Sequence, residues 1–182
     1  MPGSRDEVEA LAHDLRERGW DGDDVLSDLI ARLAAGEQPE RPLLETDPGD
    51  IGDIIESGEG GWLDLTTGFA WPQSSIDDDA LDDVPGPDDD PDRWLELPFV
   101  GSRVAWQYMA DFVDVVTDAR AADDLSSAVQ GSSALAHFQR ALDKHSDLRV
   151  HWRIHSSERH TGRARAWLDE AGYDAVPPAS TA

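Results

Sequence analysis

The stretch around Thr66-Thr67-Gly68 constrains the fold more than any other part of the chain. Residues 62–65 before it and 69–71 after it are short runs rich in aromatic and apolar side chains. Two such runs on either side of a short glycine-containing turn are typical of a β-hairpin. A third run of the same character spans residues 93–97 and stops at Pro98. The sequence therefore predicts a small antiparallel sheet of about three strands.

Apolar residues at helical spacing mark the segments that precede this sheet. Residues 4–18 form one amphipathic pattern, and a second pattern runs to Ala34 from a start at Asp21 or Asp23. We expect these two helices to form a hairpin added to the main domain. Residues 47–58 predict a shorter helix, since an aspartate followed by proline is a typical helix start.

The chain after the sheet is predicted to be helical. The expected helix starts are Ser102, Asp123 or Asp124, Ser132 or Ser133, and Ser146. Gly162 is a candidate interruption of the last helix, and Gly172 its end. We therefore predict an α+β fold in which the small antiparallel sheet packs on C-terminal helices and an N-terminal helical hairpin is attached. The expected core side chains are aromatic or apolar: Trp62, Leu65, Phe112, Phe138, Trp152 and Trp167.

Composition suggests how the chain is divided. Residues 77–92 hold nine aspartates and three prolines. The negative charges of the aspartates repel one another, and the stretch has too few apolar side chains to fill a core. We expect a solvated loop or disordered insert there. The predicted organisation is an N-terminal helical extension over residues 1–45, an α+β core domain over 46–176 that carries this insert, and a flexible tail over 177–182.

Charge excludes several classes of function. The formal net charge is -24, and -22 of it lies in the first hundred residues. Binding to DNA through phosphate contacts, or to a membrane through a polybasic surface, needs a basic face that this composition does not provide. With no cysteine, the chain has neither disulfides nor thiolate chemistry. No signal peptide pattern opens the chain, so we expect a cytoplasmic protein.

The aspartate-rich stretch is the first candidate site. An acidic surface there would attract a basic protein, although a proteome with acidic surfaces throughout would show the same composition. A calcium loop is not predicted, because the glycine and glutamate that an EF-hand requires at its sixth and twelfth positions are Asp82 and Asp88 when counted from Asp77. The candidate interaction residues are Asp77, Asp78, Asp79, Asp82, Asp83, Asp88, Asp89 and Asp90.

The C-terminal helix carries the alternative site. It holds the densest group of basic side chains in the sequence, which would bind a phosphate or an RNA backbone, or else pair with acidic residues of the same chain. Its residues are His151, Arg153, His155, Arg159, Arg163 and Arg165. His151 and His155 are one helical turn apart, but no third ligand is in register, so no metal site is predicted.

Three tryptophans, Trp62, Trp71 and Trp94, lie on the three predicted strands. Two interpretations stay open. They belong to a sheet face packed on helices, or they form a partly exposed platform on which a ligand stacks.

An ordered series of short motifs resembles a known bacterial family. The motifs are GWLDLTTG, DPDRWLELP, an aromatic helix, VQGSSALAHFQRAL, LRVHWRIH and ARAWLDEAGY, and together they span about residues 48–176. They resemble Uncharacterised Protein Family 0158, whose function is unknown. The resemblance implies an α+β domain with a small antiparallel sheet and C-terminal helices. It implies no activity, cofactor or partner.

Function is predicted from these features together. No nucleophile elbow, glycine-rich phosphate loop or Ser-His-Asp context is present, so we identify no catalytic residue and no cofactor. We expect an acidic interaction domain that docks a basic protein. The alternative is an RNA- or phosphate-binding protein, or an enzyme, built on the basic C-terminal helix.

Overall fold

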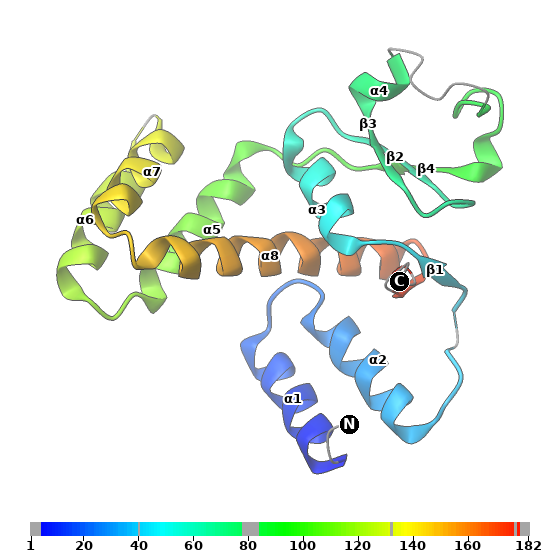
Figure 1. The fold of residues 1–182 in the computed structure, drawn as a ribbon, viewed down its shortest axis with the longest axis horizontal. Coiled ribbons are helices and arrows are strands. Elements are labelled where there is room, and N and C mark those ends of the chain that lie inside the picture. Colours follow the sequence, from blue (N-terminus) through cyan, green and yellow to red (C-terminus); the bar gives the residue numbers. More distant parts are fainter. Residues whose placement is uncertain (1–4, 40, 78–83, 132, 177, 179–182) are drawn as a thin grey trace. The chain divides into compact units, whose positions relative to one another are not determined.

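The computed structural model describes residues 5–39, 41–77, 84–131, 133–176 and 178. It divides into two units. Figure 1 labels the helices and strands and colours them by position in the sequence. The sheet unit comprises residues up to Phe99 together with those from His160 onward, and the helical unit comprises Val100–Arg159. The boundary falls within the long helix α8 (Leu148–Glu170).

The sheet unit contains both strands and helices. In chain order its elements are α1 (Arg5–Arg18), α2 (Asp23–Ala35), β1 (Leu43–Glu45), α3 (Pro48–Ser57), β2 (Gly61–Asp64), β3 (Ala70–Pro72), α4 (Gln73–Asp77), the 3-10 helix η1 (Pro91–Arg93), β4 (Trp94–Leu97) and β5 (Asp174–Val176). The helical unit contains α5 (Ser102–Val115), α6 (Ala119–Val129), α7 (Ala134–Lys144) and the first part of α8. The predicted α+β class is confirmed. No helix among the described residues has the length and apolar character required to span a membrane.

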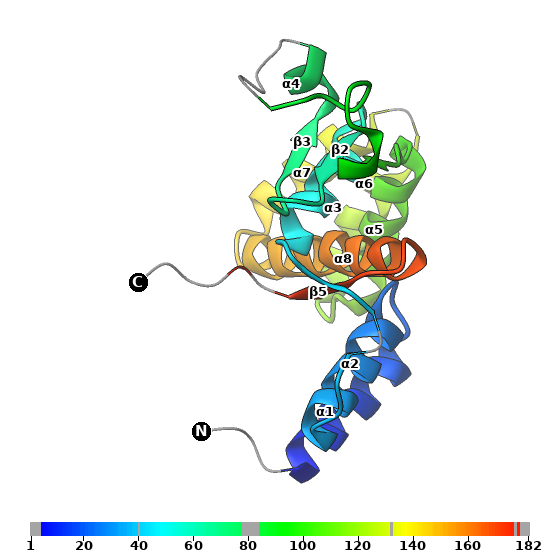
Figure 2. The ribbon, with the colours of Figure 1, turned by 90° about the vertical axis from the view of Figure 1, so that its right-hand side faces the viewer.

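The three-stranded sheet has the predicted antiparallel arrangement, with strand order β3-β2-β4. Trp62 on β2 pairs with Trp71 on β3 and with Glu96 on β4. Because side chains alternate along a strand, Leu63 lies on the opposite face from Trp62. That face packs against α3, which lies beside the sheet in Figure 2, and Leu63 is fully buried.

The predicted N-terminal hairpin is also present, as α1 and α2 lie side by side (Figure 1). Its turn differs from the expectation. The residue that caps α2 is Gly22, which has a φ of 74° and offers no side chain. Asp23 is the first helical residue, and its carboxylate is buried against Arg18 at 2.6 Å. The expectation that Asp21 or Asp23 caps the helix is therefore wrong.

The predicted interruption of α8 at Gly162 does not occur, because the helix continues to Glu170. A Cβ atom at residue 162 would lie 2.2 Å from the carbonyl oxygen of Asp21. A side chain does not fit in that space. Glycine at this position thus allows the turn of the N-terminal hairpin to approach the helix backbone.

A second, parallel pair of strands was not predicted. β1 pairs with β5 through the partners Leu43 and Asp174, Leu44 and Ala175, and Glu45 and Val176. Each strand has three residues, which is too short for alternation to be recognised in the sequence. The pair joins the end of the predicted N-terminal extension to the end of the core domain. The predicted domain boundaries themselves stay a prediction.

The described part of the aspartate-rich stretch has a defined course. The backbone N–H groups of Asp89 and Asp90 donate to the carbonyl oxygen of Gly86, and η1 follows. The Trp94 ring N–H donates to the carbonyl of Pro85 at 2.9 Å, and Trp94 itself is buried. Turn hydrogen bonds and the Trp94 ring therefore hold residues 84–92 in a loop, which is the first of the two alternatives expected for this stretch rather than the second. Residues 78–83 lie outside the described residues, as does the predicted tail at 177–182 apart from Pro178.

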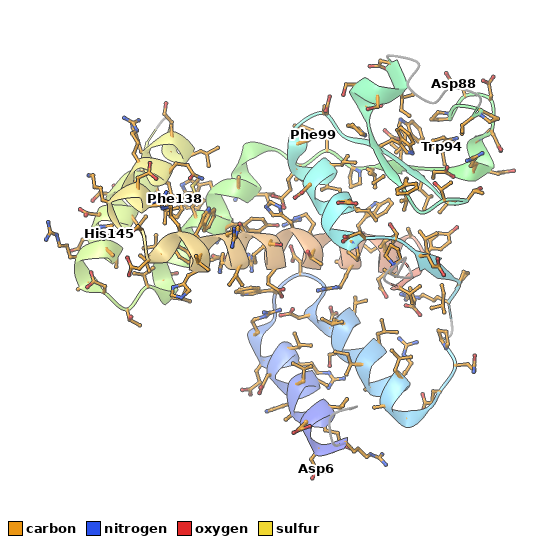
Figure 3. All side chains as sticks on the ribbon, viewed as in Figure 1. Asp6, Asp88, Trp94, Phe99, Phe138 and His145 are labelled. Carbon is orange, nitrogen blue, oxygen red and sulfur yellow. The ribbon has the colours of Figure 1, made fainter. Side chains whose placement is uncertain are left out.

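The helical unit has its own apolar core. Phe112 and Phe138, both predicted as core residues, are buried there, and Trp152 packs against them half-buried. Figure 3 shows Phe138 on the inner side of α7. The other predicted core residues, Trp62, Leu65 and Trp167, are half-buried in the sheet unit. α6 begins earlier than predicted, because Asp118 rather than Asp123 or Asp124 caps it by accepting from the Ala121 N–H at 2.8 Å.

Candidate functional site

The candidate acidic surface lies on the sheet unit. Asp77 ends α4 and accepts a hydrogen bond from Gln73 at 2.8 Å. Asp88 and Asp89 are exposed on the loop before η1, and Asp90 is half-buried; Figure 3 labels Asp88 on this loop and Trp94 on β4. The other candidate acidic residues lie outside the described residues: Asp78, Asp79, Asp82 and Asp83.

A buried ion pair at the end of the hairpin was not predicted from the sequence. Arg93 donates from Nε to Asp64 Oδ1 at 2.9 Å and from Nη2 to Oδ2 at 2.7 Å. The same carboxylate accepts from the Thr66 backbone N–H at 2.9 Å and from the Thr67 hydroxyl at 2.8 Å. The Asp64 side chain is 3% exposed and that of Arg93 18% exposed. Asp64 therefore joins the turn of the hairpin to the start of β4.

These contacts set the charge state of Asp64. Burial of the carboxyl opposes its ionisation, but the hydrogen bonds from Arg93, Thr66 and Thr67 and the charge of Arg93 outweigh burial, so the pKa of Asp64 lies below its ordinary value. The carboxylate and the guanidinium are both charged near neutral pH and neutralise each other inside the sheet unit.

This pair changes the charge balance of the surrounding segment. Residues 51–100 contain 14 acidic residues and a single basic residue, Arg93. Arg93 donates to Asp64 from both Nε and Nη2. The other acidic residues of positions 51–100 therefore have no second basic residue within this segment to pair with. Asp77, Asp88 and Asp89 are exposed members of that group.

A second ion-pair cluster lies where α3 meets the C-terminal part of α8. His160 contacts Asp53 from Nδ1 at 3.1 Å and Glu56 from Nε2 at 2.9 Å. Arg163 lies 2.8 Å from Asp21 and 3.8 Å from Glu56. Burial lowers the pKa of His160, but the hydrogen bonds and charges of Glu56 and Asp53 outweigh burial and raise that pKa above its ordinary value. The cluster attaches α8 to α3 and to the turn of the N-terminal hairpin.

The raised pKa of His160 predicts a pH dependence of stability. Its contribution should be fully present below the unfolded pKa of about 6.5 and should be lost as the pH rises through the higher folded pKa. We therefore expect His160→Gln to destabilise the protein more at about pH 5.5 than at about pH 9. Urea unfolding of wild type and variant at both pH values measures this difference.

A matched control for this prediction is available on the same helix. His151 is exposed, so His151→Gln should change stability little at either pH. If the cost of His160→Gln were equal at the two pH values, or grew toward the alkaline side, the charged imidazole would not be the stabilising form.

The residues of the alternative basic site differ in exposure and fall in both units. His151 and Arg153 are exposed, whereas His155 is buried, with its ring 5.4 Å from Phe112 and 5.9 Å from Trp152 between centroids. The structure places these three residues and Arg159 in the helical unit, and Arg163 and Arg165 in the sheet unit.

Two of its arginines have structural ion pairs. Arg159 lies 2.5 Å from Asp111, with its guanidinium 4.8 Å from the centre of the Tyr108 ring, and Arg163 is in the His160 cluster. Internal pairing, one of the two interpretations of this basic group, is what the structure shows for these two side chains. Within the described parts of the chain, no three or more His, Asp or Glu side chains gather in a way that would hold a metal ion.

The three strand tryptophans share the sheet face opposite Leu63, since Trp62 pairs with Trp71 and Trp94 pairs with Asp64. The Trp62 ring N–H donates to Gln73 of α4 at 3.0 Å, and Trp94 donates to the loop at Pro85. These bonds favour a packed face over a stacking platform. The packing elements are α4 and the loop rather than the expected C-terminal helices.

The structure thus defines an α+β protein in which a three-stranded sheet with an internal Asp–Arg pair is followed by consecutive helices. Residues 56–179 match the model of the Uncharacterised protein family (UPF0158). The match covers well over half of the chain, so the chain belongs to this family, as its motifs indicated. Asp64, Arg93 and His160 lie within the matched segment, and the α1–α2 hairpin precedes it. Comparison with curated proteins and with solved structures gave no match.

Proposed function

We propose that this chain is a binding domain whose acidic sheet unit docks a basic protein. The observation that carries the proposal is the internal use of Arg93, the only basic residue among 14 acidic residues in positions 51–100. Within this segment Asp64 pairs with Arg93, while Asp53 and Glu56 contact His160 and Arg163 of α8. The exposed aspartates of α4 and of the loop before η1 have no basic residue left in the segment to pair with, so we infer that they attract a cation from a partner.

The exposed acidic residues are suitably placed for such an encounter. Asp77, Asp88, Asp89, Asp92 and Glu96 are exposed on α4, the following loop, η1 and β4. A surface of one charge sign accelerates association with a partner of opposite sign by long-range attraction, which salt screens over about 10 Å at 0.1 M. The acidic surface favours a protein partner with a basic face and disfavours a nucleic acid.

The competing proposal, binding of RNA or phosphate by α8, has less support. Arg159 and Arg163 already bind carboxylates, which would have to be released before either could hold a phosphate. Arg153 is exposed and is the residue through which this alternative is best tested.

The decisive experiment compares two variants of equal net charge. The immobilised full chain captures proteins from a lysate at low salt, and the captured protein is identified and purified. Its association rate is then measured with Asp88→Lys/Asp89→Lys and with Asp114→Lys/Asp123→Lys, a pair of exposed residues of the helical unit. We expect the first variant to associate roughly tenfold more slowly at low salt and the second to resemble wild type.

Three outcomes would contradict the proposal. Equal slowing by the two variants would mean that only net charge matters. Salt-insensitive binding would exclude steering by exposed charges. Binding that disappears in Arg153→Ala but not in Asp88→Lys/Asp89→Lys would support the basic helix instead.

A further inference from the structure

Strand β4 forms one edge of the three-stranded sheet, because the strand order is β3-β2-β4 (Figure 1). Its pairing with β2 fixes which of its backbone groups point away from the sheet. The Leu65 N–H donates to the Arg93 carbonyl at 2.9 Å, directly before the paired residues of β4. In an antiparallel pair, residues that bond to the neighbouring strand alternate with residues that do not. Since Arg93 bonds to β2, the next outward-pointing residues along β4 are Trp94 and Glu96.

The outward backbone groups of β4 are only partly used. The Trp94 N–H donates to the carbonyl of Pro91. The Trp94 carbonyl and both backbone groups of Glu96 have no hydrogen-bond partner in the described parts of the chain. β4 ends at Leu97, and Pro98 after it has no N–H. These outward carbonyl and N–H groups are the ones through which a further strand can join a sheet edge.

The opposite edge of the sheet, β3, is less suited to adding a strand. The Asp64 N–H donates to the Phe69 carbonyl at 2.9 Å, so Ala70 and Pro72 are the outward-pointing residues of β3 by the same alternation. Proline has no N–H to donate, and α4 begins at Gln73, directly after it. Of the two edges of this sheet, β4 therefore offers the more complete set of backbone groups.

The side chains along the β4 edge indicate what charge an added strand should carry. Glu96 is exposed, lies opposite Trp62 on the tryptophan face, and makes no ion pair within the described residues. Asp88, Asp89 and Asp92 are exposed on the segment that leads into β4. In a hydrogen-bonded antiparallel pair the two Cα atoms are about 5.5 Å apart and the side chains share a face. Opposite charges in such a pair attract and like charges repel, so this edge favours a basic strand over an acidic one.

We propose that the basic partner docks by adding an antiparallel strand to β4, with a lysine or arginine directly opposite Glu96. The inference rests on the proposed docking function for the charge of the partner and adds the form in which the partner binds. Glu96 exchanges both of its backbone hydrogen bonds with that basic residue, and the Trp94 carbonyl accepts from the residue two positions further along the added strand. Basic residues at every second position then lie on the tryptophan face, and the residues between them lie beside Leu95.

A second copy of the chain is the less favourable occupant of this edge. Pairing of β4 with β4 of another copy would bring Glu96 and its acidic neighbours close to the same residues of the other molecule. Each chain also has a formal net charge of -24, which opposes self-association.

A blocked peptide of alternating threonine and lysine tests the proposal on the isotope-labelled full chain by NMR titration. Two matched peptides of the same charge carry N-methyl groups, one on its lysines and the other on its threonines. The lysine N–H groups are the ones that face β4 in the proposed register, and N-methylation removes them as donors. We expect the parent peptide to shift the Glu96 amide signal with a dissociation constant on the order of 1 mM. The lysine-methylated peptide should bind at least roughly tenfold more weakly, and the threonine-methylated peptide should bind like the parent.

A pair of variants at one position tests the same contact from the side of the protein. Glu96→Gln and Glu96→Pro both remove the carboxylate, but only proline also removes the outward N–H. Because that N–H points away from β2, proline there costs no hydrogen bond within the sheet. We expect Glu96→Gln to weaken binding of the parent peptide a few-fold and Glu96→Pro by at least roughly tenfold. Equal weakening by the two variants would overturn the proposal.

The peptide titrations decide the proposal even if Glu96→Pro fails to fold. Absence of binding by the parent peptide up to about 10 mM would overturn it. Equal binding of the two methylated peptides would also overturn strand addition, and the proposed docking function would stand if that binding still weakened with salt. Binding that depends on the lysine N–H groups but not on salt would support strand addition and contradict steering by charge. A dimer that sedimentation detects in wild type and not in Glu96→Pro would show that a second copy occupies the edge, and would overturn the proposal.

Discussion

Arg93→Met is expected to lower the melting temperature by roughly 6–20 °C at neutral pH. The variant keeps the apolar length of the side chain but leaves the Asp64 carboxylate, 3% exposed, without its guanidinium. Removing one partner of a buried ion pair is strongly destabilising because the other charge remains buried. Thermal unfolding followed by circular dichroism measures the change, and Arg153→Met, at an exposed arginine, is the matched control.

The pH dependence of this loss identifies its cause. Without Arg93, only the hydrogen bonds from Thr66 and Thr67 oppose the effect of burial, so the pKa of Asp64 should lie higher in the variant than in wild type. The penalty of the variant is then present above that pKa and is relieved as the pH falls through it. We expect the difference between wild type and Arg93→Met to shrink between pH 7 and about pH 4.

A double replacement completes the test. Asp64→Leu/Arg93→Met should be more stable than Arg93→Met alone, since it removes the uncompensated buried charge. The Thr66 N–H and the Thr67 hydroxyl lose their acceptor in this variant, but both residues are exposed, so water can take its place. A double variant less stable than Arg93→Met would show that the hydrogen bonds to the turn, rather than the charge pair, hold the hairpin.

The features that the sequence predicted well depend on local patterns. The β-hairpin follows from two aromatic runs around one turn, and α3 follows from Asp47, whose side chain accepts from the Gly49 N–H at 2.7 Å. Periodicity and capping act over a few residues, so they can be recognised without knowing the rest of the fold. Where several aspartates compete for the same role, as at the starts of α2 and α6, the local pattern is ambiguous and the expected cap was wrong.

The features that it did not predict join distant parts of the chain. Asp64 and Arg93 are 29 positions apart, and the β1–β5 pair joins the residues near position 44 to those near position 175. Neither partner shows a pattern by itself, because each depends on the topology that brings the other close. A signal for the ion pair was nevertheless present: a single arginine in a strongly acidic segment, next to a strand, is a strong candidate for an internal partner.

The same distinction applies to the candidate sites. The acidic residues were recognised because charge is additive and needs no folding. The basic residues of α8 were grouped by proximity in sequence, yet a helix turns its side chains through all directions. Its members consequently differ: His155 is buried among aromatic rings, Arg159 binds Asp111, and Arg153 is exposed.

Phe138→Ala should destabilise the helical unit more than any change on its surface. Phe138 is fully buried, and its ring meets those of Phe112 and Trp152 edge-on, with centroids 6.3 Å and 4.8 Å away. Truncating a buried phenylalanine costs about 3–5 kcal/mol, since transfer free energy is lost and a cavity is left. Urea unfolding gives this loss in free energy.

The matched control for Phe138 lies one turn earlier on α7. Leu135 is 55% exposed, so Leu135→Ala should change the free energy of unfolding by no more than about 0.5 kcal/mol. Hydrogen exchange shows where the protein is destabilised. The amides of α5, α6 and α7, the helices that form the core around Phe138, should lose protection in Phe138→Ala and keep it in Leu135→Ala. Similar losses in the two variants would mean that Phe138 does not organise this core, and that the aromatic cluster with Phe112 and Trp152 is not what holds α7 in place.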